Sequence, residues 1–331
     1  MKRFITVALV FSLAIFASAC SGEKPADIAI DTDISDSLIK IGFSQVGAES
    51  GWRSAHSESM KNAFCEENGY YLAFHDAHQQ QQNQISAINS FIKLGVDYII
   101  LAPVTETGWD NILTEAKNAN IPVIIVDRMI DVANDDLYVC WVGSNFRAEG
   151  DKAVSWMAET FKNNRKVNIA HIQGTLGSSA QIGRTDGLST GIVKNPSWEI
   201  IAQESANFTK EQGRAVMEDI LKKHDDIDVV YCENDDEALG AIEAIEASGK
   251  TVGTRGDITI VSFDATKAAL EMVLSGKISY VVECNPLHGP IVEKIISDME
   301  KGVQPEKFFY IEEASFDSAT ITQADVDARM Y

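Results

Sequence analysis

The chain of 331 residues exceeds the usual size of a single domain, so we expect two lobes, each long enough to bury its own core. It carries 28 basic and 49 acidic side chains, which gives a formal charge of −21 at pH 7. This excess of negative charge excludes nucleic acids and anionic membrane surfaces as electrostatic partners, and it favours a neutral or cationic small ligand.

Residues 1–20 have the pattern of an export signal. Lys2 and Arg3 precede an apolar run at 4–16, which is too short to span a bilayer, and small residues then precede Cys20. Small residues followed by cysteine resemble a lipobox, so we expect lipidation of Cys20, with 21–37 as an acidic tether; the alternative is ordinary cleavage near residue 19. The mature chain is then expected on the periplasmic or extracellular face of a membrane, which it contacts only through the lipid.

Four further cysteines, Cys65, Cys140, Cys232 and Cys284, are spaced too widely and irregularly for a zinc ribbon. Export permits a disulfide. Cys140 and Cys232 fall in apolar runs typical of core strands, which favours buried free thiols. The sequence alone assigns no pairing.

From residue 38 onward, short β-branched runs alternate with longer amphipathic segments, which is the pattern of βαβ units and parallel sheets. In the first half we expect strands at 38–44, 71–75, 97–103, 121–127 and 138–143, with helices at 52–68, 80–94 and 108–118. The alternation then restarts, with strands at 167–174, 199–203, 228–232, 258–264 and 278–284 and helices at 148–163, 178–193, 210–224 and 238–248. The fold class is therefore α/β, and the restart marks a second lobe.

In open parallel sheets, ligands bind beyond the carboxyl ends of the strands. The loop at 45–53, after the first expected strand, combines glycines with an aromatic residue, a cation and an anion. Asp127 and Arg128, Asn234 and Asp264 lie at the ends of later strands. A sugar needs carboxylates, amides and guanidinium groups for its hydroxyls and an aromatic ring for its C–H face, and these loops supply all of them.

Five segments in chain order carry a family resemblance. They are GFSQVGAESGWR at 42–53, QNQISAINSFI at 82–92, LAPVTETGW at 101–109, IPVIIVDR at 121–128 and ENDDEALGAI at 233–242. Together they resemble the pentose and hexose class of periplasmic binding proteins, and within it the galactofuranose binders most. The resemblance extends from about residue 38 to the C-terminus.

The resemblance implies a type I periplasmic binding protein, in which two Rossmann-like lobes joined by a three-segment hinge close on a monosaccharide. It implies a first lobe of 38–145 with 285–310 and a second lobe of 146–284 with 311–331. A protein of this class acts as a monomer and delivers its sugar to the permease of an ABC transporter. The alternative partner is a membrane receptor or sensor kinase, to which a sugar-sensing subunit would present the same ligand.

Residue by residue, the resemblance implies a set of sugar contacts. Asp127 and Arg128 would bind hydroxyls from the first lobe, and Arg184, Asn234 and Asp264 would do so from the second. Each has a structural alternative, because Asp127 and Arg128 could form a local ion pair, Arg184 could lie on a helix surface, and Asn234 or Asp264 could cap a helix.

The remaining candidates come from the same resemblance. Trp52 would stack on the sugar, unless it only fills the core, and Arg53 would contact a hydroxyl. Phe208 matches a family aromatic residue. Gln45 and Asp76 are further candidates at neighbouring strand ends. After the last strand, Glu283 and Asn285 stand where ribose binders carry a glutamine, which argues against ribose and leaves the two as alternatives.

The sequence offers no sign of a cofactor or of catalysis. His75 and His78 lack a complete set of metal ligands around them. No phosphate-binding loop or nucleophile motif is found, although two carboxylates could in principle serve a glycosidase. A sugar-sensing repressor would need a DNA-binding motif at the N-terminus, where the export signal stands. We therefore expect a binding protein rather than an enzyme.

Overall fold

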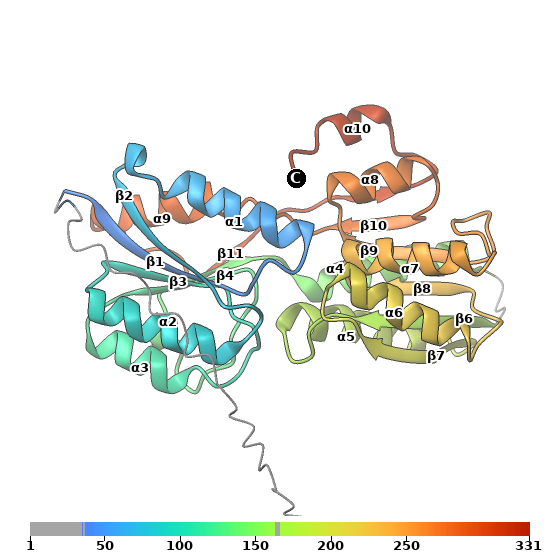
Figure 1. Cartoon of the computed structure of the whole chain (residues 1–331), viewed down its shortest axis with the longest axis horizontal. Helices are drawn as coiled ribbons and strands as arrows, with labels where there is room; N and C mark the ends of the chain where they lie inside the picture. The colour runs from blue at the N-terminus through green and yellow to red at the C-terminus, as the bar shows by residue number, and fades with distance from the viewer. Residues whose placement is uncertain (1–34, 36, 163–165) are drawn as a thin grey trace, which may run out of the picture.

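The computed structural model describes residues 35, 37–162 and 166–331. Two α/β lobes lie side by side, each built around a six-stranded sheet (Figure 1). The predicted export signal, Cys20 and most of the acidic tether lie outside the described residues. No helix in the described ranges is both long and apolar enough to cross a bilayer.

The first sheet has the strand order β11-β5-β4-β3-β1-β2, and all its neighbouring strands are parallel. Its strands are β1 (Ile39–Gln45), β2 (Tyr70–Asp76), β3 (Tyr98–Leu101), β4 (Val123–Val126), β5 (Cys140–Gly143) and β11 (Phe308–Tyr310). The helices are α1 (Gly51–Ala63) and α9 (Gly289–Glu300), which pack together, and α2 (Gln81–Leu94) and α3 (Asp110–Asn118), which form a second pair. Because each pair covers one face, β3 and β4 are buried on both sides.

The second sheet has the order β12-β10-β9-β8-β6-β7 and is parallel except for β12. Its strands are β6 (Val167–Gln173), β7 (Trp198–Ser205), β8 (Val229–Cys232), β9 (Thr259–Asp264), β10 (Tyr280–Glu283) and β12 (Ser315–Asp317). Helices α4 (Phe146–Thr160) and α5 (Ser179–Lys194) cover one face, and α6 (Lys210–Leu221), α7 (Asp235–Ala247) and α8 (Lys267–Leu274) cover the other. The short α10 (Gln323–Asp327) packs on α8.

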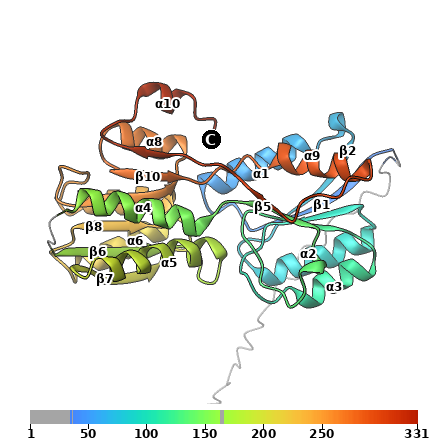
Figure 2. The same ribbon diagram turned by 180° about the vertical axis from the view of Figure 1, so that it is seen from behind.

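The chain crosses between the lobes three times. The first crossing joins β5 to α4, the second joins β10 to α9, and the third joins β11 to β12. Figure 2 shows the third crossing as the chain returns from β11 towards the second lobe. Three short connections side by side allow a hinge between the two sheets.

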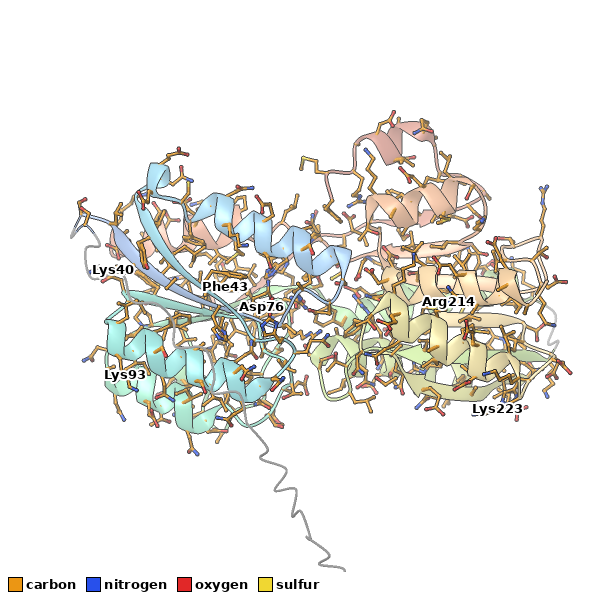
Figure 3. The ribbon with its side chains drawn as sticks, viewed as in Figure 1. Lys40, Phe43, Asp76, Lys93, Arg214 and Lys223 are labelled. Carbon is orange, nitrogen blue, oxygen red and sulfur yellow. The ribbon has the colours of Figure 1, made fainter. Side chains whose placement is uncertain are left out.

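The carboxyl ends of the strands in the first lobe face the second lobe. In Figure 3, Lys40 at the start of β1 lies at the outer end of the molecule, whereas Asp76 at the end of β2 lies on the side of the second lobe. The loops after these strands therefore meet the second lobe, where a ligand site is expected in parallel sheets.

The structure differs from the sequence prediction at several element ends. The expected helix at 52–68 ends at Ala63 and is followed by a 3₁₀ turn, Glu66–Asn68, because Gly69 adopts φ 89° and turns the chain into β2. The expected helix at 238–248 begins earlier, at Asp235, because Asn234 caps it.

The expectation of free thiols is met by the four cysteines in the described part of the chain. All four are unpaired, and Cys140, Cys232 and Cys284 are buried. Burial raises the pKa of each of these three thiols, so they remain protonated at neutral pH.

Candidate ligand-binding site

A small cavity lies between the lobes, in the position where ligands bind in parallel sheets. The predicted residues that line it are Trp52, Arg53, Asp127, Arg128, Arg184, Phe208, Asn234 and Asp264. Glu49, Ser50, Phe146, Ala180 and Cys284 also line it. Residues more than two hundred positions apart thus meet at the edges of the two sheets.

The first lobe contributes a buried network of charges. Arg53 places Nη1 2.7 Å from Oδ2 of Asp127 and donates from Nε to Oε1 of Glu49 at 2.9 Å. Burial alone would lower the pKa of Arg53, but the two carboxylates raise it overall. Burial, with the neighbouring Arg53, lowers the pKa of Arg128 to about 10, so both arginines are charged at neutral pH.

Two carboxylate oxygens in this network lack a hydrogen-bond donor. Glu49 Oε2 and Asp127 Oδ2 are buried and accept no hydrogen bond from the described residues, although Asp127 Oδ2 pairs by charge with Arg53. A buried acceptor without a donor is costly, by about 1–3 kcal/mol. A ligand hydroxyl in the cavity would supply the missing donors.

The second lobe contributes a charge cluster around Arg184. Its Nε donates to Glu149 Oε2 at 2.7 Å, Nη1 donates to the carbonyl of Glu233, and Nη2 lies 3.3 Å from Asp264 Oδ1. Burial would lower the pKa of Arg184, but Glu149 and Asp264 raise it. Burial raises the pKa of Asp264, against the opposing effect of Arg184. Arg184 is therefore held in place by the protein before any ligand binds.

Apolar side chains from both lobes complete the wall. Trp52, Phe146, Ala180, Phe208 and Cys284 form one buried cluster. The Trp52 ring stacks on His56 with centroids 5.2 Å apart and donates from Nε1 to the Cys284 carbonyl at 2.6 Å. Because this ring is already packed and only 4% exposed, Trp52 acts as a wall of the cavity.

Backbone strain is concentrated at the cavity. Asp127, Phe208 and Asp264 have φ values of 61°, 63° and 101°, in the region that residues with a Cβ rarely occupy. Phe208 also packs against Gly174, where a Cβ atom would lie 1.9 Å from the Phe208 ring. Strained backbone of this kind persists where the surrounding structure imposes it, and it clusters at functional sites.

Direct hydrogen bonds join the lobes around the cavity. The Gly51 amide donates to Asp236 Oδ2 at 2.9 Å, and the Met129 amide donates to Ser179 Oγ at 2.8 Å. A third bond runs from the Glu106 amide to the Gly177 carbonyl at 2.9 Å. The lobes are therefore in a closed arrangement, and the cavity lies inside it.

Asn234 uses both of its polar groups within the protein. Its Oδ1 caps α7 by accepting from the Glu237 amide at 2.8 Å, and its Nδ2 donates to the Phe208 carbonyl at 3.1 Å. It lines the cavity, but the helix-capping alternative also applies. Asp264 does not cap a helix, since Thr266 caps α8.

Four predicted contacts do not reach the cavity. Gln45 lies behind it, where its Oε1 accepts from Arg53 at 3.2 Å. Asp76 accepts from the backbone of His78 in a turn. Glu283 pairs with Arg329, and Asn285 turns its own loop by accepting from the Leu287 amide. Each of these side chains bonds to another part of the protein instead of facing the cavity, and its position next to a strand end in the sequence did not predict that partner.

Some of the lining residues that were not predicted do carry a signal in the sequence. Glu49 and Ser50 belong to the same loop as Trp52 and Arg53, and Ser50 caps α1 by accepting from the Arg53 amide. Phe146 and Ala180 lie in helices without any motif, so only the fold brings them to the cavity.

Comparison with known proteins identifies the family. The model of a family described as periplasmic binding protein domain matches residues 41–288. The chain belongs to this family. The predicted type I fold, the family resemblance and the prediction that the chain is not an enzyme are thereby confirmed.

Three similar proteins indicate where in this family the chain lies. It is 38% identical to the galactofuranose-binding protein YtfQ of Escherichia coli (strain K12), over 81% of this chain and 85% of that protein. A Mycobacterium smegmatis protein solved with β-D-fucofuranose is 44% identical, with a TM-score of 0.82 over 88% of this chain and 93% of that chain. The binding protein of the arabinose ABC transporter from Shewanella sp. ANA-3, bound to L-arabinofuranose, is 38% identical, with a TM-score of 0.83 over 88% and 95% of the two chains.

Proposed function

We propose that this chain is the extracytoplasmic binding protein of an ABC sugar importer and captures a neutral monosaccharide in its furanose form. The observation that carries the proposal is the cavity between the lobes, which buried arginines and carboxylates from both lobes line. Aromatic and charged groups in fixed positions suit a small molecule with many hydroxyls.

The balance of charge in the cavity favours an uncharged ligand. Arg53, Arg128 and Arg184 carry three positive charges. Glu49, Asp127 and Asp264 offset them formally, and each arginine is already paired. A sugar phosphate or sugar acid would bring a further charge that no unpaired group in the cavity lining matches, at a large desolvation cost.

The ligands of similar proteins support a furanose. The three proteins compared above are described with galactofuranose, fucofuranose or arabinofuranose. Hydrogen bonds of this kind can account for micromolar affinity. Such binding requires a free energy of about 8 kcal/mol, and each hydrogen bond to a charged group contributes about 1.5–3 kcal/mol. Four or five such bonds with an apolar face would suffice.

Each lobe would have its own part in capture. Glu49, Arg53 and Asp127 would bind the sugar hydroxyls from the first lobe. Arg184 and Asp264 would join when the second lobe closes, and the Phe208 ring would cover the C–H face. The ligand favours the closed form because only that form makes both sets of contacts.

The closed form would then be the species that the membrane partner recognises. A lipid at Cys20 would hold the protein at the membrane surface near its permease. A sensor kinase would use the same closed form, and isolating the membrane protein that binds the sugar-loaded chain distinguishes the two partners.

A thermal-shift screen tests the proposal. The chain without residues 1–20 is heated with D-galactose, L-arabinose, D-fucose, D-ribose, D-glucose and a methyl galactofuranoside. A ligand at a thousand times its dissociation constant adds about 4 kcal/mol, which raises the melting temperature by roughly 5–10 °C. A large shift with a sugar that adopts furanose forms supports the proposal. No shift with any sugar, or hydrolysis of a nitrophenyl galactofuranoside, would overturn it.

A further inference from the structure

The Glu313 carboxyl group connects all three crossings between the lobes through hydrogen bonds. Glu313 lies on the third crossing, between β11 and β12. Its Oε1 accepts from Ser144 Oγ on the first crossing at 2.5 Å and from the Asn285 amide on the second at 2.8 Å. Lys152 on α4 donates to the Glu313 carbonyl at 2.8 Å. Any rotation of the lobes about the hinge must therefore disturb the surroundings of this carboxyl.

A second carboxyl, that of Glu149, connects this point to the ligand cavity. Glu149 is 1% exposed, and its Oε2 accepts from Arg184 at 2.7 Å. Its Oε1 accepts no hydrogen bond from the described residues. One carboxylate oxygen of Glu149, one carboxylate oxygen of Glu313 and the sulfur of Cys284 all lie within 4.8 Å of one another. The carboxyl groups of Glu149 and Glu313 are thus neighbours.

Two buried carboxyls within 4.8 Å of each other do not both ionise at low cost, so one of them retains a proton. Burial, with Glu149 as the next cause, raises the pKa of Glu313 to about 8. Burial also raises the pKa of Glu149, against the opposing charge of Arg184. Since Arg184 stabilises the ionised form of Glu149, the proton belongs on Glu313.

We propose that the neighbouring carboxyls of Glu149 and Glu313 hold one proton between them, on Glu313, in the closed form and that closure on the ligand takes this proton up from solvent. The proposal rests on the proposed function, because ligand binding drives the closure. Opening moves the three crossings apart and admits water to Glu313, which then loses its proton at neutral pH. The pair thereby couples Arg184 in the cavity to the hinge.

The sign of the pH dependence follows from the direction of the shift. Below the ordinary glutamate pKa of about 4.3, both forms hold the proton and affinity is independent of pH. Between there and about 8 the closed form binds more protons than the open form, so affinity falls as the pH rises. Above about 8 neither form holds the proton, and the curve levels off.

Other titratable groups around the hinge also bear on the pH dependence of binding, and their contributions must be distinguished from that of Glu149 and Glu313. Burial lowers the pKa of His288 to about 4 and also lowers the pKa of His56, so both are neutral above pH 5.5. The Cys284 thiol remains protonated, and Arg184 remains charged. The Lys152 ammonium donates to the Glu313 backbone carbonyl. In the second lobe, burial raises the pKa of Asp235 to about 7 and also that of Asp264, so these carboxyls contribute their own pH dependence.

The substitution Glu313→Gln isolates the proposed proton. Glutamine keeps an acceptor for Ser144 and Asn285 and supplies a fixed donor towards Glu149, so it imitates the protonated form. The neighbouring Glu312 is exposed, and Glu312→Gln is the matched control. Glu149 is a positioning residue for Arg184, and Glu149→Gln should weaken binding at every pH.

The test is calorimetry of L-arabinose and D-galactose binding, in EDTA, at pH 5.5, 7 and 8.5. The native chain and Glu312→Gln should lose at least about tenfold in affinity between pH 5.5 and 8.5. Glu313→Gln should lose much less affinity over the same range. At pH 7, buffers of different ionisation enthalpy should reveal a larger proton uptake on binding in the native chain than in Glu313→Gln.

An equal pH slope in the native chain and Glu313→Gln would overturn the proposal. So would a pH dependence that disappears when EDTA is omitted, because a bound divalent cation would then occupy the carboxyl pair. If neither sugar binds any variant, the proposed function fails separately. Small-angle scattering of the ligand-free chain then tests the proton on Glu313 without a sugar. A native chain that is more compact at pH 5.5 than at 8.5, with no such change in Glu313→Gln, supports the proposal. The same pH dependence of compactness in both chains overturns it.

Discussion

Replacing Asp127 by asparagine tests the polar side of the cavity most directly. The change keeps the shape of the side chain but removes the charge that faces Arg53 at 2.7 Å. It also removes a charged acceptor, which Asp127 Oδ2 would offer to a sugar hydroxyl. A hydrogen bond to a charged group contributes about 1.5–3 kcal/mol, so affinity should fall by roughly tenfold to 150-fold. Arg53 keeps its bond to Glu49 at 2.9 Å, so the fold should survive.

The assay is calorimetric titration with the sugar that gives the largest thermal shift. Asp136→Asn is the control, because Asp136 forms an exposed ion pair with Lys117 far from the cavity, and such pairs contribute about 0–1 kcal/mol. Its affinity should equal that of the native chain. An Asp127→Asn variant that unfolds cooperatively and binds within twofold of the native chain would refute the role of Asp127 in the site.

Three further substitutions test how the site is built. Gly174→Ala places a Cβ 1.9 Å from the Phe208 ring and should displace that ring. Sugar affinity, measured by calorimetric titration, should then fall at least about tenfold. Unchanged affinity would show that Phe208 does not contact the ligand. Asp236→Ala removes the bond from the Gly51 amide across the cleft, and we expect faster sugar release in stopped-flow fluorescence with little change in the association rate. Trp52→Phe removes a hydrogen bond to the second crossing and should lower the free energy of unfolding by about 1 kcal/mol in urea; a variant as stable as the native chain would contradict that contribution.

Much of the architecture could be predicted from the sequence because the strands of a parallel sheet are buried on both faces. The expected strands at 97–103 and 121–127 contain continuous apolar runs at 98–102 and 121–126, and the structure places β3 and β4 inside them. The strands β11 and β12 carry no such signal. Each has only three residues, and each is a strand because a neighbour in its own sheet, β5 or β10, pairs with it.

The sequence by itself determined that polar residues follow the strands, and hence that Asp127, Asn234 and Asp264 would gather near one edge; Arg184, within α5, was expected there only from the family resemblance. The tertiary structure alone decided which side chains enter the cavity. Glu283 and Asp76 lie at strand ends as well, yet Arg329 and a local turn engage them. Glu149 and Glu313 belong to no motif, and only the meeting of the three crossings places them together. The physical reason is that strand position fixes where a residue lies along the sheet, whereas the partners that take up its side chain depend on how loops and distant segments fold around it.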